Sequence, residues 1–304
     1  MVLSSTVCGE TGPFPSEFAW ARLRLLPKPA FQMLVWLGAA NSTNHWRYGV
    51  KRRFRMASLL SGTLALVVLA GCSDSNEPGH FAEENWSSAN IVSGGLLYDK
   101  WWKVNGGTEP TTDFDPIWAS QATNTRSGAD TWRCKECHGW DYIGNLGRYS
   151  SGSHFTGFAG VWSARNTDRA IIFEAIKDAG GDHDLSSVLT DTDVLNLTKF
   201  IVDGLVDMSL YLNPSTGLAT GNETAGQTLY VANCASCHGS DGKSIDFDSD
   251  PGDQGVGWLS LDNPQETLHK IRWGHPGSAM PSMIGSGLSD QQTGDILAYA
   301  QTLQ

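Results

Sequence analysis

Two short segments of the chain combine paired thiols with an imidazole at the same spacing. Their sequences are CKECH at residues 134–138 and CASCH at residues 234–238, and a Gly follows each. Two Cys three positions apart lie on one helical turn, where both thiols can form thioethers with the two vinyl groups of a haem, and the neighbouring His can bind the iron. The segments predict two covalently bound haem c groups, with thioethers at Cys134, Cys137, Cys234 and Cys237 and iron ligands at His138 and His238.

The remaining cysteines narrow the chemistry further. The chain has six Cys, and the two outside these segments are Cys8 and Cys72, which both lie near the N-terminus. With four thiols assigned to haem, we expect no disulfide, no thiolate ligand to iron and no catalytic thiol.

The charge of the chain is distributed unevenly. The formal net charge is −11 over 304 residues, but residues 1–71 carry eight Lys and Arg against two Glu, which leaves a net charge of −17 for the rest. An acidic surface repels the phosphate backbone of nucleic acids. We therefore expect no nucleic acid partner, whereas the acidic surface would suit a basic redox protein and also favours solubility.

A short apolar run follows a basic cluster near the N-terminus. Four of residues 51–55 are Lys or Arg, an apolar stretch extends over residues 56–70, and Gly71-Cys72 comes next. A basic region, a short apolar region and a small-residue end are typical of a secretory signal, and this run is too short to span a membrane comfortably. We expect residues 1–71 to form a leader and the protein to be exported.

The end of this leader, Leu69-Ala70-Gly71-Cys72, resembles the lipobox of bacterial lipoproteins. The resemblance implies cleavage before Cys72 and acylation of its thiol, which would anchor the protein to the membrane on the periplasmic side. An ordinary signal peptide with an incidental Cys is the alternative. Residues 72–90 are rich in Ser, Asn and Glu, and we expect them to form a flexible tether.

The rest of the chain repeats one order of elements. Each half begins with a helical pattern that contains Gly and Tyr, at Gly95 to Tyr98 and at Gly226 to Tyr230, and continues through its CxxCH segment into a Gly-rich loop. A middle helix is expected at residues 166–179 and again at residues 263–273. A last helix with helical apolar spacing follows in each half, opened by Thr190-Asp191 and by Ser289-Asp290.

The domain boundaries follow from this repeat. An insertion at about residues 106–132 separates the first helix from its CxxCH segment in the first half only. Residues 214–223, rich in Pro, Gly and Thr, read as a linker between the halves. We expect one domain at residues 91–213 and a second at residues 224–304.

This order of elements resembles the small class I cytochromes c, and the second half fits them better. The resemblance implies an all-α fold of two tandem cytochrome c domains with covalently bound haem and long loops. In that family a Gly on the first helix lets it cross the last helix closely, against an aromatic residue. Gly226 and Tyr299 stand where these residues should, and Gly95 is the expected counterpart in the first half.

The sixth iron ligand of the second half is expected in the loop between its middle and last helices. This loop contains Met280-Pro281, and a Met-Pro pair at this place is the ligand motif of the family. The resemblance therefore implies Met280 as the axial ligand opposite His238. The alternatives are that Met280 is a core residue and that Met283 or His275 binds the iron.

The equivalent loop of the first half contains no Met. Aligning Ile176 with Ile271 in the middle helices, and Leu189 with Leu288 at the start of the last helices, places His183 at positions that bracket Met280. We predict His183 as the ligand opposite His138, with His154 and Met208 as alternatives. Because imidazole lowers the potential relative to a thioether, we expect electrons to run from the first haem to the second.

Aromatic residues are frequent near both CxxCH segments. We expect them to wall the haem pockets, where burial tunes the redox potential and excludes water, and the alternative is ordinary packing in the protein core. These residues are Trp101, Trp102, Trp132, Trp140, Tyr142, Trp258 and Trp273.

We interpret the chain as a dihaem electron carrier that relays single electrons between redox partners in the periplasm or the membrane. The alternative is a haem-dependent oxidoreductase of peroxidase-like type, or the cytochrome subunit of a dehydrogenase. A peroxidase needs a haem whose distal position can open, and His154 or His183 could serve such a site if neither binds iron at rest. We expect a protein that is not itself catalytic.

Overall fold

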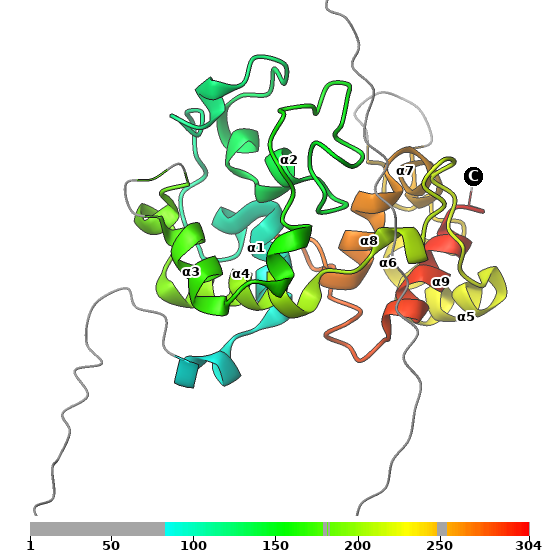
Figure 1. Cartoon of the computed structure of the whole chain (residues 1–304). Coiled ribbons are helices and arrows are strands. Elements are labelled where there is room, and N and C mark those ends of the chain that lie inside the picture. Colours follow the sequence, from blue (N-terminus) through cyan, green and yellow to red (C-terminus); the bar gives the residue numbers. More distant parts are fainter. Residues whose placement is uncertain (1–82, 179–180, 182, 248–253, 304) are drawn as a thin grey trace, which may run out of the picture. The chain divides into compact units, whose positions relative to one another are not determined.

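The computed structural model describes residues 83–178, 181, 183–247 and 254–303, and within these residues it is helical and contains no strand (Figure 1). The expected leader, the lipobox with Cys72 and most of the tether lie outside the described residues. None of the helices in the described part is long and apolar enough to cross a membrane.

The described residues of the first half form four α-helices, labelled in Figure 1. They are α1 (Ile91–Lys100), α2 (Cys134–His138), α3 (Arg169–Lys177) and α4 (Asp191–Lys199), and a π-helical turn, Phe200–Gly204, extends α4. Short 3₁₀ turns connect these helices, at Glu83–Ser88, Trp101–Lys103, Trp118–Ser120, Gly128–Trp132, Trp162–Asn166, Leu185–Ser187 and Met208–Leu210. The expected middle helix at residues 166–179 is therefore shorter and begins after a 3₁₀ turn.

In the second half, five α-helices lie within residues 223–247 and 254–303, the part that the structure describes. They are α5 (Glu223–Asn233), α6 (Ala235–His238), α7 (Val256–Asp262), α8 (Pro264–Trp273) and α9 (Asp290–Ala300). Helix α8 confirms the expected middle helix at residues 263–273. Helix α5 ends at Asn233 and α6 begins at Ala235, so Cys234 is the one residue between them.

Equivalent caps begin the last helices of the two halves. Thr190 and Asp193 form a capping box at the start of α4, and Ser289 and Gln292 form one at the start of α9. Each box pairs a side chain with the backbone N–H of the other residue, which satisfies donors that the first helical turn leaves free. The predicted starts of both last helices are confirmed.

The first helix of each half crosses the last helix at a Gly. A Cβ on Gly226 of α5 would collide with the carbonyl group of Asp295 on α9, and a Cβ on Gly94 of α1 would collide with that of Asn196 on α4. Only Gly permits such an approach of two helix backbones. The expectation that Gly95 plays this part is therefore wrong, because Gly94 is the residue at the crossing.

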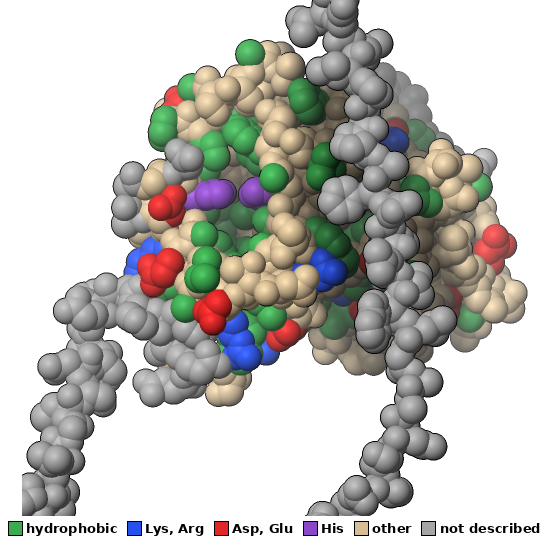
Figure 2. All heavy atoms as spheres, viewed as in Figure 1, with side chains coloured by type: hydrophobic (Ala, Val, Ile, Leu, Met, Phe, Trp, Pro, Cys, Tyr) green, Lys and Arg blue, Asp and Glu red, His purple; other side chains and the backbone are tan. Residues whose placement is uncertain are grey.

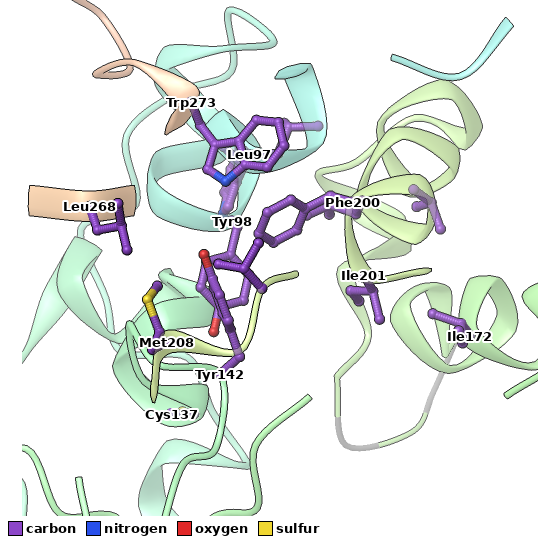
Figure 3. Close-up of a cluster of buried hydrophobic side chains, with 14 of the residues drawn as sticks. Leu97, Tyr98, Cys137, Tyr142, Ile172, Phe200, Ile201, Met208, Leu268 and Trp273 are labelled. Atoms are coloured by element: carbon purple, nitrogen blue, oxygen red, sulfur yellow. The ribbon is translucent and has the colours of Figure 1, made fainter. Parts of the chain in front are cut away.

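Gly95 packs against the other half of the molecule instead. A Cβ at this position would collide with the indole of Trp273 on α8, and that indole also meets Phe200 with ring centroids 5.5 Å apart. Figure 3 shows Trp273 beside Leu97, Tyr98 and Phe200, so residues from both halves share one hydrophobic cluster. The adjacent glycines of α1 thus serve two contacts, one within the first half and one between the halves.

The end of the expected tether is structured rather than flexible. Residues 83–88 form a 3₁₀ turn, and the ring of Trp86 lies 4.3 Å from the guanidinium of Arg169 and 4.4 Å from the ammonium of Lys199. Cation–π contacts with α3 and α4 hold this segment against the first half. The polar composition of residues 72–90 predicted a flexible tether, but the contacts of Trp86 fix its last residues against the first half.

Candidate haem-binding sites

A cavity of about 420 Å³ lies beside the first CxxCH segment. Cys134, Cys137 and His138 line it from α2, and His183 lines it from the loop that follows α3. Its other lining residues are mostly apolar, such as Ile172. Figure 2 shows two histidine side chains next to each other over a hollow lined by hydrophobic side chains.

The tautomer of His138 follows from its hydrogen bond. Nδ1 lies 2.7 Å from the carbonyl oxygen of Ala159, and because a carbonyl can only accept, Nδ1 carries the hydrogen and donates it. Nε2 is then left with a free lone pair, as a metal ligand requires. Burial lowers the pKa of His138 to about 4, so the imidazole is neutral at pH 7.

His183 faces His138 across this cavity. The centroids of the two imidazole rings are 5.9 Å apart, and their planes are inclined by 22°. An imidazole–metal bond is about 2 Å long, so a metal held between two imidazoles places their centroids about 6 Å apart. The structure therefore brings together the two residues that the sequence paired as ligands of the first iron.

The alternative ligands of the first half lie elsewhere. His154 does not line the cavity, because its ring stacks on Tyr149 at 4.6 Å and its Nδ1 lies 3.1 Å from Oε1 of the buried Glu136. Met208 is a core residue, 6% exposed, and it is also absent from the cavity wall. Of the three candidates, His183 alone faces the cavity.

The thiols of the first half are held in their neutral form. Cys134 and Cys137 are not joined in a disulfide, and burial raises the pKa of each thiol to about 12. A neutral thiol is a poor metal ligand and a poor nucleophile. Ligation of a metal by a thiolate is therefore disfavoured at this pair.

A second cavity, of about 250 Å³, lies beside the second CxxCH segment. Cys234 and His238 line it together with Met280, and His275 does so as well. Met283 is instead 5% exposed and lies in the hydrophobic core. Both Met280 and His275 thus remain at the cavity, and Met283 does not.

The second site differs from the first in its polar details. Burial raises the pKa of the Cys234 thiol to about 11 and lowers that of His275 to about 4. Nδ1 of His238 is buried and has no hydrogen-bond partner among the residues that the structure describes, and burial lowers the pKa of this imidazole. Here too the thiol and both imidazoles are uncharged at pH 7.

The backbone around the two CxxCH segments follows the same course. The hydroxyl of Tyr98 donates to the carbonyl of Gly139 at 2.7 Å, and that of Tyr230 donates to the carbonyl of Gly239 at 3.1 Å. Gly139 and Gly239 have φ angles of 79° and 80°, a region that favours Gly. The Gly after each segment is therefore required by the turn that ends the helix, and the two halves are locally equivalent.

Most of the aromatic residues that we expected in the pocket walls lie elsewhere. Of that set Trp132 alone lines either cavity. Trp101, Trp102, Trp140 and Trp273 are buried in the protein core, and Trp258 is 40% exposed. The expectation was wrong because aromatic composition predicts burial and does not specify which cavity or contact the ring fills.

Both cavities fit a haem c by their donors. The first offers two neutral thiols and a neutral imidazole, and the second offers the neutral thiol of Cys234 and a neutral imidazole, with Cys237 exposed on the same helical turn; both walls are largely apolar. Arg133, which directly precedes the first CxxCH segment, lines the first cavity, and sequence reasoning missed two charged residues of the second wall, Glu266 and Lys270. Arg133 and Lys270 both form ion pairs with Asp99 at the boundary between the halves, an arrangement that no local pattern reveals.

Comparison with known proteins assigns the second half. Residues 223–304 match the family model described as cytochrome c. No curated protein matches the chain. The matched range contains the Cys234 and Cys237 pair and the whole of the second cavity wall. Residues 223–304 therefore form a cytochrome c domain, which implies one haem c and electron transfer as its chemistry.

Proposed function

We propose that the chain is a dihaem cytochrome c that carries single electrons between redox protein partners, with residues 91–213 as a second haem-binding domain. The observation that carries the proposal is the first cavity itself. This cavity lies beside a second CxxCH segment followed by the same turn. The imidazole of His183 faces that of His138 there, with ring centroids 5.9 Å apart.

The axial ligands follow from the residues at each cavity. In the first half they are His138 and His183, supported by their ring separation and by the absence of His154 and Met208 from the wall. In the second half they are His238 and Met280, supported by the position of Met280 at the cavity and by the Met-Pro pair of the family. His275 is the competing ligand there.

When bound, haem c supplies a reversible one-electron couple between Fe(III) and Fe(II). The protein residues hold and tune this group. The four thiols would attach two haems, two thiols to each. The hydrogen bond from Nδ1 of His138 to the carbonyl of Ala159 orients one imidazole, and the apolar cavity walls exclude water. If the four axial side chains hold the two irons, the haems would serve electron transfer rather than substrate binding.

The cellular setting is part of the proposal. Cytochrome c domains are typically extracytoplasmic, and the N-terminal sequence up to Cys72 has the order of an export signal with a lipobox. The protein would then be tethered by acyl chains at Cys72 on the periplasmic side and would meet its partners there. These partners are redox proteins, and the acidic surface favours basic ones.

Spectroscopy of the reduced protein with carbon monoxide tests the carrier against the enzyme. An electron carrier with two ligands on each iron shows six-coordinate, low-spin bands and binds no carbon monoxide. A peroxidase-like enzyme has one iron with an open position, so it shows a high-spin fraction and binds one equivalent. That second result would contradict the proposed function.

A further inference from the structure

One buried carboxylate connects the two cavities. Asp99, on α1, is fully buried, and it forms ion pairs with the guanidinium of Arg133 and with the ammonium of Lys270. Arg133 lines the first cavity and Lys270 lines the second. These three residues, the interface ion cluster, therefore place a single negative charge between one cation from each cavity.

The cluster lies in surroundings that screen charge poorly. The side chains of Arg133 and Lys270 are 11% and 9% exposed. Their charged groups lie 5.8 Å and 5.3 Å from the ring centroid of Trp140, which is 1% exposed. Salt does not penetrate such a site, and the interaction of two charges falls slowly with distance there.

Asp99 is ionised in this cluster. Burial alone would raise the pKa of its carboxyl group, but the charges of Lys270 and Arg133 and their hydrogen bonds hold it well below the usual range. The carboxyl group of Asp99 is therefore ionised at pH 7.

The repeat shows that the cluster is not a requirement of the domain fold. The two halves can be aligned by the glycines of their helix crossings, by their CxxCH segments and by their middle helices. In these alignments Val231 corresponds to Asp99, Asn233 to Arg133 and Ala175 to Lys270. Val231 is 58% exposed and Ala175 lines the first cavity. The three charges therefore belong to the contact between the halves.

The geometry points to Asp99 as an electrostatic bridge that sets the redox potentials of both haems together, through cations that line the two cavities. This inference rests on the proposed dihaem function. Asp99 touches neither cavity, so it acts as a positioning and tuning residue through Arg133 and Lys270.

The direction of the effect follows from charge. Oxidation adds one positive charge to an iron, and a buried negative charge nearby stabilises the oxidised form and lowers the potential. Loss of the Asp99 charge raises both potentials. Loss of the Lys270 charge lowers them, and it acts most on the second haem because Lys270 lines that cavity.

The test is a potentiometric titration of the haem-loaded Asp99→Asn variant, which is isosteric and removes the charge. We expect both midpoint potentials to rise, each by about 59 mV. For one electron this corresponds to a roughly tenfold change in the ratio of reduced to oxidised iron at a given potential. Lys270→Gln shifts the potentials the opposite way. A merely structural ion cluster would destabilise the protein in both variants without this reversal of sign.

Asp130→Asn is the matched control. Asp130 also binds Arg133, at 3.1 Å, but its side chain is 49% exposed and it has no contact with Lys270. Solvent screens its charge, so we expect a clearly smaller shift than for Asp99→Asn.

Two results overturn the bridge. One is a folded Asp99→Asn protein in which one or both potentials equal those of the wild type. The other, decisive if Asp99→Asn does not fold, is a Lys270→Gln protein with unchanged potentials. Haem counted on the same samples separates the failures, since one equivalent per chain contradicts the dihaem function and two equivalents with unchanged potentials contradict the bridge alone.

Discussion

The imidazole rings of His138 and His183 face each other across the first cavity, with centroids 5.9 Å apart and planes inclined by 22°. These residues are 45 positions apart in the chain and come from α2 and from the loop after α3. Their pairing would give a haem in the first cavity two imidazole ligands. The second cavity offers one imidazole and one thioether if Met280 is the ligand.

Replacement of His183 tests this pairing. In His183→Ala the first iron loses its sixth ligand, so we expect the reduced protein to gain a high-spin signal and to bind one equivalent of carbon monoxide per chain. His154→Ala is the control, because His154 packs on Tyr149 outside the cavity. Carbon monoxide binding by the His154 variant and not by the His183 variant would reverse the assignment.

Replacement of Met280 tests the second iron. Met280→Ala removes a thioether that favours Fe(II), so we expect the higher of the two midpoint potentials to fall and the weak near-infrared band of sulfur ligation to disappear. His275→Ala is the control, since His275 lines the same cavity. Loss of the band in the His275 variant, or no change in the Met280 variant, would contradict the assignment.

Unequal ligands predict unequal potentials in the unmodified protein. Two imidazoles at the first iron lower its potential relative to the second, and a gap on the order of 100 mV supplies about 2.3 kcal/mol per electron. A redox titration followed by absorption should therefore resolve two steps, with the lower one belonging to the haem whose spectrum changes in His183→Ala. A single step for both haems would contradict the direction of transfer proposed here.

The helix crossing in the first half predicts a stability effect. In Gly94→Ala the new methyl group collides with the backbone of α4, which cannot rotate away, so we expect the free energy of unfolding to fall by about 1–3 kcal/mol. Chemical denaturation followed by circular dichroism measures the change. Ser93→Ala on the same helix adds no atom and should leave stability nearly unchanged, and equal effects in the two variants would contradict the crossing.

His269 predicts a dependence of stability on pH. Its Nε2 donates to the carbonyl of Gly95 at 3.0 Å and its Nδ1 accepts from the hydroxyl of Tyr142 at 2.9 Å, so the ring is neutral. Burial lowers its pKa from 6.5 to about 3. Below pH 6.5 the unfolded chain therefore binds a proton that the folded protein excludes, and this contribution to stability is lost as the pH falls from 6.5 toward 3.

The size of this effect is about 1.4 kcal/mol per pH unit within that window. His138 and His275, whose pKa values are lowered to about 4, contribute in the same window, so unfolding measured between pH 4.5 and pH 7 should lose about 1.4 kcal/mol per pH unit of its slope in His269→Gln. His154→Gln, at a partly exposed His, should leave the slope unchanged. An undiminished slope in the His269 variant would assign the acid sensitivity to the other groups alone.

The sequence predicted the elements whose signals are local. The CxxCH segments, the caps at Thr190 and Ser289 and the place of His183 each depend on spacing within a few residues or on alignment of the two halves. The turn after each CxxCH segment also has the same backbone conformation, with φ of 79° at Gly139 and 80° at Gly239.

Features that depend on contact between distant residues were missed. The pairing of Asp99 with Lys270, the packing of Gly95 on Trp273 and the docking of Trp86 follow from how α1 meets α8 and how residues 83–88 meet the first half. No periodicity or motif encodes these contacts. A charged residue in α1 reads as solvent-exposed until its buried partner is known.

The central claim is that two haem groups are attached to one chain, one in each half, and haem stoichiometry tests it most directly. The pyridine haemochrome of the purified protein should give two equivalents per chain, and one equivalent in a Cys134→Ala/Cys137→Ala variant. One equivalent in the unmodified protein, retained in that variant, would show that residues 223–304 alone bind haem and would contradict the account.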